Sequence, residues 1–138
     1  MSGGILVKDK NILVDRRYLK IIEKNNKYAF RVYPRNNRIQ FLGTSIEYEN
    51  LEDCKTASRS FIKLVIEKSI NSYQSRFIEL DKEKRENDVW YYKYVLMDSD
   101  KKPLFYQKPV LNKTNSKKGV ASLYDTISEC LYGKEILN

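Results

Sequence analysis

The chain has 138 residues, a formal net charge of +8 and no histidine. The lack of histidine excludes catalytic sites of the Ser-His-Asp or Cys-His kind, because histidine is the general base in both. With 41% hydrophobic and 32% charged residues, the composition is that of a folded domain. No apolar run approaches the roughly 18 residues of a transmembrane helix, and the N-terminus lacks the apolar core of a secretory signal. We therefore expect a cytoplasmic protein.

The first half of the chain predicts strands followed by one helix. Its strand candidates are short β-branched or alternating runs at residues 5–7, 12–14, 18–22, 28–33 and 38–45. The first two flank a polar turn and predict an N-terminal hairpin. From Leu51 the apolar residues recur at helical spacing, so a helix is predicted to about residue 73, with Asn50 as its N-cap.

The second half repeats this order. Strands are predicted at residues 76–80, 89–97 and 103–107, with a mixed-charge loop at 81–88 and a polar turn before the third strand. A helix follows, capped by Asn115 or Ser116 and ending before Gly133, which suits a helix C-terminus. Gly119 in its first turn weakens a helix by about 1 kcal/mol relative to alanine. We expect this glycine to allow close packing of the helix on its sheet.

The fold class predicted is therefore α+β, with the order strand-strand-strand-helix occurring twice. Residues 1–16 form the hairpin extension, 17–74 the first unit and 75–138 the second. One such unit buries little apolar surface, so we expect the two to pack into one compact body. The protein is then either a monomer with internal pseudo-symmetry or a homodimer.

Two stretches resemble the repeat of YegP-like proteins. "KYAFRVYPRNNRIQFLGTSIEYENLEDC" resembles the strands and helix start of that repeat, and "NSKKGVASLYDTI" resembles its helix. The first copy lacks the helix glycine and the second lacks the Thr-Ser strand end. The resemblance implies an α+β fold of tandem β-β-β-α units. Because the family is largely uncharacterised, it supplies no catalytic residues.

Positive charge is concentrated in residues 24–46 and 101–124, neither of which contains a carboxylate. Both stretches include a predicted hairpin between the second and third strands, so we expect the two hairpins to form one surface if the units pack symmetrically. Tyrosines among these cations can stack bases while lysine and arginine hold phosphates. The predicted nucleic-acid-binding residues are Arg31, Arg35, Arg38, Lys93, Lys101, Lys102, Lys108, Lys117, Lys118, Tyr33, Tyr91 and Tyr106.

The preferred interpretation is a non-enzymatic nucleic-acid-binding module, for DNA or RNA. The alternative is a protein-interaction module, such as a small phage or mobile-element factor that docks on a host complex. An enzyme is the least favoured class, since strand-end and helix-start positions explain the carboxylate pairs Glu47/Glu49 and Glu52/Asp53. The two cysteines match no metal spacing, so no metal or cofactor is expected.

Overall fold

The computed structural model describes residues 12–35, 40–68 and 76–133. Seven strands form a single antiparallel sheet with the order β1-β2-β3-β4-β7-β6-β5. Their bounds in that order are Ile12–Asp15, Leu19–Lys24, Lys27–Val32, Gly43–Ser45, Pro103–Gln107, Trp90–Met97 and Ile78–Lys84. Two helices, α2 (Leu51–Glu67) and α3 (Lys113–Thr126), complete the fold, and α3 continues into a π-helical turn, η1 (Ile127–Leu131). The predicted α+β class is confirmed.

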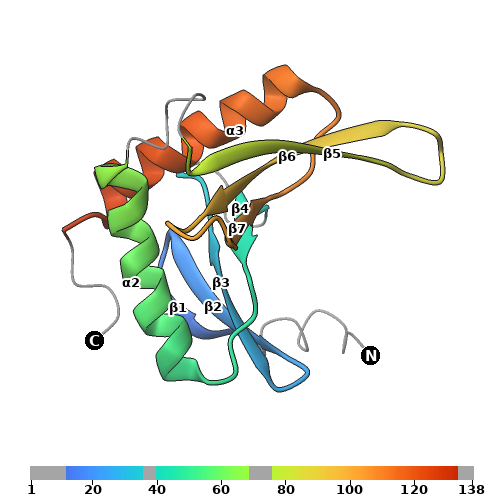
Figure 1. The fold of residues 1–138 in the computed structure, drawn as a ribbon. Coiled ribbons are helices and arrows are strands. Elements are labelled where there is room, and N and C mark those ends of the chain that lie inside the picture. The colour runs from blue at the N-terminus through green and yellow to red at the C-terminus, as the bar shows by residue number, and fades with distance from the viewer. Residues whose placement is uncertain (1–11, 36–39, 69–75, 134–138) are drawn as a thin grey trace.

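Both helices cover the same face of the sheet (Figure 1). Under them, three rings from different elements form the centre of the core: Phe30 of β3, Phe61 of α2 and Phe105 of β7. Phe61 lies 5.3 Å from Phe30 and 4.5 Å from Phe105 between ring centroids. Aromatic contacts of this kind add to the free energy gained from burying the rings. The opposite face of the sheet carries no helix of the described chain, and we call it the open face.

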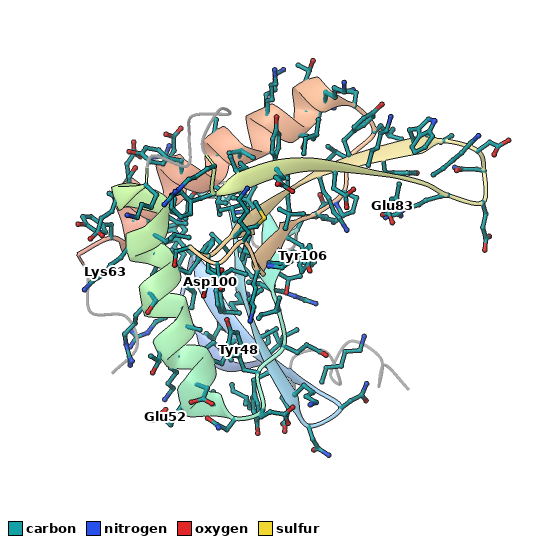
Figure 2. The ribbon with its side chains drawn as sticks, in the orientation of Figure 1. Tyr48, Glu52, Lys63, Glu83, Asp100 and Tyr106 are labelled. Carbon is teal, nitrogen blue, oxygen red and sulfur yellow. The ribbon has the colours of Figure 1, made fainter. Side chains whose placement is uncertain are left out.

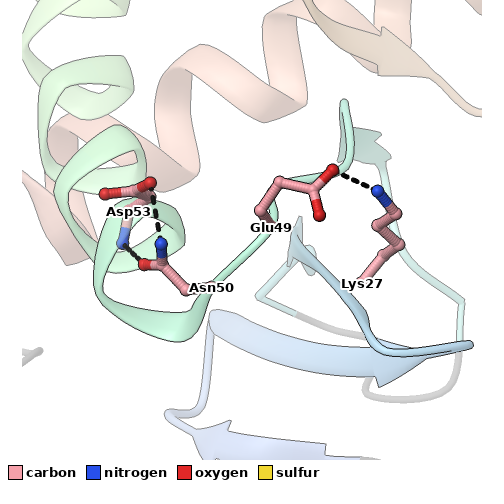
Figure 3. A network of polar contacts seen from close by, with 4 residues as sticks. All are labelled: Lys27, Glu49, Asn50 and Asp53. Carbon is pink, nitrogen blue, oxygen red and sulfur yellow. Dashed lines mark hydrogen bonds and ion pairs between the residues drawn. The ribbon is translucent and has the colours of Figure 1, made fainter.

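After β1, the order strand-strand-strand-helix occurs twice, as β2-β3-β4-α2 and β5-β6-β7-α3. The two helices also begin alike. Asn50 accepts a hydrogen bond from the backbone N–H of Asp53, and Asn112 accepts one from Asn115, both at 2.8 Å. The first cap lies beside the ion pair of Lys27 with Glu49, which ties the β2–β3 hairpin to the segment before α2 (Figure 3). The predicted cap Asn50 is confirmed.

Several predicted boundaries change. Residues 12–14 form a strand as predicted, and among the described residues this strand pairs with β2. The other strand of the predicted N-terminal hairpin, residues 5–7, lies outside the described part of the chain. The strand predicted at residues 38–45 is shorter in the structure: of its described residues, 40–45, Gly43–Ser45 form a strand. The predicted loop at 81–88 is wrong for residues 81–84, because β5 continues to Lys84, whereas residues 85–88 do connect the two strands. The predicted caps of α3, Asn115 and Ser116, are wrong as well, since α3 begins three residues earlier, at Lys113.

Ser116 is instead buried against the sheet, where it contacts Gln107 of β7. Gln107 Oε1 accepts hydrogen bonds from Tyr94 N at 2.9 Å and from Ser116 Oγ at 2.5 Å, and its Nε2 donates to Ser116 O at 2.7 Å. A Cβ atom on Gly119 would overlap Nε2 of Gln107. The expectation that Gly119 permits close packing of helix on sheet is therefore confirmed.

The first half replaces this arrangement with smaller groups. At the end of β4, Ser45 Oγ accepts a hydrogen bond from the backbone N–H of Phe30 at 2.9 Å. Gln107 Oε1 accepts the corresponding hydrogen bond from the backbone N–H of Tyr94. Cys54 and Ala57 follow the cap of α2 at the same distances along the chain as Ser116 and Gly119 follow the cap of α3. Because serine is too short to reach the helix, α2 accommodates the Cβ of Ala57. A glycine is needed only where the long glutamine occupies the space.

We predict that Gly119→Ala destabilises the protein although alanine is the better helix former. Displacing Gln107 breaks buried hydrogen bonds at a cost of about 1–3 kcal/mol, which exceeds the propensity gain of about 1 kcal/mol. Denaturant unfolding is expected to show a net loss of up to about 2 kcal/mol. Adding Gln107→Ser, which copies Ser45, recovers part of that loss. A gain in stability from Gly119→Ala alone would contradict the close contact.

Candidate nucleic-acid interface

The open face brings together part of the predicted set. Strand register places Arg31 of β3 opposite Thr44 of β4, Thr44 opposite Tyr106 of β7, and Tyr106 opposite Val95 of β6. Residues paired in this way across a sheet point to the same face. Lys93, two residues before Val95 in β6, shares that face. Arg31, Lys93 and Tyr106 thus lie on one surface, as predicted.

The cations of the open face lie over aromatic rings. The Arg31 guanidinium carbon lies 4.2 Å from the centroid of Phe41, and Lys108 Nζ lies 5.4 Å from the same ring. Lys93 Nζ lies 5.2 Å from the centroid of Tyr106. Among the described residues, none of these three cations forms an ion pair. We call Arg31, Lys93, Lys108, Phe41 and Tyr106 the central cluster.

Carboxylates border the central cluster on both sides. At one edge of the sheet Asp15 pairs with Lys20, with 3.7 Å between Oδ1 and Nζ. At the other edge β5 contributes Glu79, Asp81 and Glu83, which alternate toward the open face; Figure 2 shows Glu83 on the side of the strand away from α3. The open face is therefore positive along its middle strands and acidic at its margins.

The other predicted residues of the first half are not in the central cluster. Tyr33 is only 5% exposed, so its ring cannot receive a base. Arg35 forms an ion pair with Glu129 of η1 and so points toward the helical layer. Arg38 lies outside the described residues.

The two basic hairpins do not form one surface. The antiparallel pairing of β4 with β7 sets Gly43 opposite Gln107 and Ser45 opposite Phe105. The β3–β4 connection therefore lies at one end of the sheet and the β6–β7 turn, with Lys101 and Lys102, at the other. In that turn Asp98 Oδ1 accepts from the backbone N–H groups of Asp100 and Lys102 at 2.8 and 3.0 Å, which places carboxylates beside the lysines.

Lys117 and Lys118 are exposed in α3, on the helical side of the molecule. Lys117 is four residues after Lys113 and shares its side of the helix. That side faces β6, because Lys113 Nζ lies 6.0 Å from the ring centroid of Tyr92. These two cations consequently belong to a different surface from the central cluster.

That second surface includes residues that sequence reasoning missed. The outer part of the β5–β6 hairpin reaches away from the rest of the molecule (Figure 1), and we call residues 81–92 the arm. Strand alternation sorts the charges of the arm, with Lys82 and Lys84 opposite Tyr92 and Trp90 on the helical side. Asp81 and Glu83 lie opposite Lys93 and Tyr91 on the open side. The alternation of lysine and carboxylate from residue 81 to 84 was the signal, and it was hidden by interpreting the segment as a loop.

Three side chains that could serve in catalysis, those of Cys54, Glu49 and Glu52, are buried or paired. Burial raises the pKa of the Cys54 thiol to about 12, so this cysteine is no nucleophile. Glu49 pairs with Lys27, and Glu52 Oε2 lies 3.6 Å from Lys55 Nζ. Within the described ranges, no three His, Cys, Asp or Glu side chains come together as metal ligands. In the same part of the chain, no helix combines the length and apolarity required to cross a bilayer.

Comparison with known proteins supports the fold. No family model and no curated protein matches the chain. The solution NMR structure of the UPF0339 protein SO3888 from Shewanella oneidensis is similar, with a TM-score of 0.54 and 16% sequence identity. The match covers 78% of this chain and 81% of that one. At this identity the likeness concerns the fold alone, and the chain has a YegP-like fold.

The buried thiol gives a test that depends on pH. At pH 8 about one Cys54 thiol in 10,000 is ionised, so we expect iodoacetamide to label the half-buried Cys130 first and Cys54 only in denaturant. The folded chain keeps the Cys54 proton up to about pH 12, whereas the unfolded chain releases it near the ordinary value of 9.0. Stability should thus fall above pH 9, by at most about 1.4 kcal/mol per pH unit from this group. Cys54→Ala removes that contribution, and equal labelling of both cysteines in the native protein would contradict it.

Proposed function

We propose that the protein is a non-enzymatic nucleic-acid-binding module, a distant YegP-like protein made of two tandem β-β-β-α units. The observation that carries this proposal is the central cluster: Arg31, Lys93 and Lys108 lie over Phe41 and Tyr106 on a sheet face without a helix. A guanidinium stacked on a ring keeps its edge available for a phosphate. A cytoplasmic location remains a prediction.

The balance of charges on the open face supports an anionic partner. The three cations of the central cluster form no ion pair in the described part of the chain, although Asp81 lies opposite Lys93 across β5 and β6. Arg31 Nε is buried and makes no hydrogen bond there, so ring stacking, and not a carboxylate, holds this side chain. The acidic margins, Asp15 and the carboxylates of β5, repel a phosphate backbone and favour its passage along the middle strands.

A matched pair of charge variants tests the open face. We expect Arg31→Gln/Lys93→Gln/Lys108→Gln to weaken oligonucleotide binding at about 50 mM salt by tenfold or more, and to reduce the slope of log affinity against log salt by about three. The measurement is fluorescence polarisation with labelled single- and double-stranded oligonucleotides. The control, Lys63→Gln/Lys101→Gln/Lys102→Gln, removes the same charge elsewhere and should bind like the parent.

Two results would argue against this function. The absence of binding to every oligonucleotide at low salt would overturn the proposal. Equal losses in both triple variants would show that net charge alone, rather than the central cluster, determines binding.

One observation favours protein interaction as the second candidate. β1 is an edge strand of the sheet formed by the described residues, and Leu13 on it is 43% exposed. Edge strands can accept a strand of another chain through their unpaired backbone groups. Such a partner would fit a small phage or mobile-element factor that docks on a host complex. Retention of one stoichiometric partner after nuclease treatment would favour this function.

A further inference from the structure

The helical side of the arm carries a second aromatic and basic surface. Trp90 is 42% exposed, and two lysines of β5 flank its ring. Lys82 Nζ lies 4.9 Å and Lys84 Nζ 5.8 Å from the ring centroid. Tyr92 is two residues along the same strand, with Lys113 Nζ over its ring. Two aromatic faces in line are thus bordered by three cations.

Little on this surface competes for the cations. Lys84 Nζ lies 3.4 Å from Asp88 Oδ1, but the Asp88 side chain is 86% exposed. Ion pairs as exposed as this one contribute almost nothing to stability, so a phosphate can replace the carboxylate. The other carboxylates of β5 within the arm, Asp81 and Glu83, point to the opposite side.

We propose that this side of the arm binds single-stranded nucleic acid by stacking an unpaired base on the indole of Trp90. Lys82, Lys84 and Lys113 would hold the adjacent phosphates. The proposal takes its ligand class from the proposed function, but it rests on a site that is separate from the central cluster. An indole can stack only on a base whose face is free, which excludes the interior of a duplex.

A protein partner suits this surface less well. Covering Trp90 with an apolar surface would remove water from Lys82 and Lys84 without compensating their charge, which is costly. A strand of nucleic acid supplies the ring and the anion together. The arm is also accessible, because no helix covers its outer part (Figure 1).

The single tryptophan of the chain makes the test direct. When it is excited at wavelengths that tyrosine does not absorb, intrinsic fluorescence reports Trp90 alone, and a stacked base quenches it. We expect a single-stranded oligothymidylate to quench this fluorescence with the same midpoint as its polarisation curve, and a duplex of equal length to leave it unchanged. Trp90→Ala should weaken single-strand binding by about fivefold to a hundredfold. Lys82→Gln/Lys84→Gln should raise the midpoint, whereas Lys63→Gln/Lys102→Gln should not.

The outcomes separate this site from the proposed function. Binding seen by polarisation with unchanged fluorescence, and unaffected by Trp90→Ala, overturns the arm site and leaves the nucleic-acid function standing. Equal quenching by duplex and single strand overturns the stacking of an unpaired base. Quenching that persists in the Arg31→Gln/Lys93→Gln/Lys108→Gln variant supports a separate site. Circular dichroism and thermal unfolding confirm that each variant is folded.

Discussion

The pairing of β4 with β7 is the contact on which the rest of the structure depends. Only three residue pairs join these strands, from Gly43 with Gln107 to Ser45 with Phe105. At the seam a Cβ on Gly43 would lie 2.6 Å from Tyr106 O, so the two strands meet at a distance that glycine permits. This short ladder joins the four strands β1 to β4 and the three strands β5 to β7 into one sheet. It also brings Phe30 and Phe105 under Phe61, which makes the core common to both halves.

The same pairing decides where charge can act. Because β4 and β7 run antiparallel, the β3–β4 connection and the β6–β7 turn lie at opposite ends of the sheet. The two basic hairpins cannot then form one surface. What the pairing does place together is the open side of the middle strands, where Arg31 and Tyr106 share a transverse row. A binding surface is therefore expected along the strands of the sheet, not at their turns.

The sequence predicted the elements better than their arrangement. Periodicity located both helices and most strands, since the apolar positions of α2 and of β3 have clear spacings. It failed at residues 81–84, where every side chain is charged and the alternation is between signs of charge rather than between apolar and polar residues. It also could not supply the β4–β7 register. Gly-Thr-Ser carries no apolar pattern, and the pairing is specified by packing of the two helices on one face. The position of the arm depends on the charged strand at residues 81–84, and the position of the central cluster depends on the β4–β7 register. The sequence therefore did not predict either position.

The differences between the halves have a physical logic. The second half keeps a glycine in its helix because Gln107 reaches from the sheet to Ser116, and the first half needs none because Ser45 does not reach that far. The long side chain of Gln107 thus requires glycine at position 119. The short side chain of Ser45 leaves room for the Cβ of Ala57. The backbone groups that these side chains satisfy, Phe30 N and Tyr94 N, occupy matching places in the two halves. The interior of each half therefore contains a corresponding hydrogen bond, although the side chain that accepts it is serine in one half and glutamine in the other.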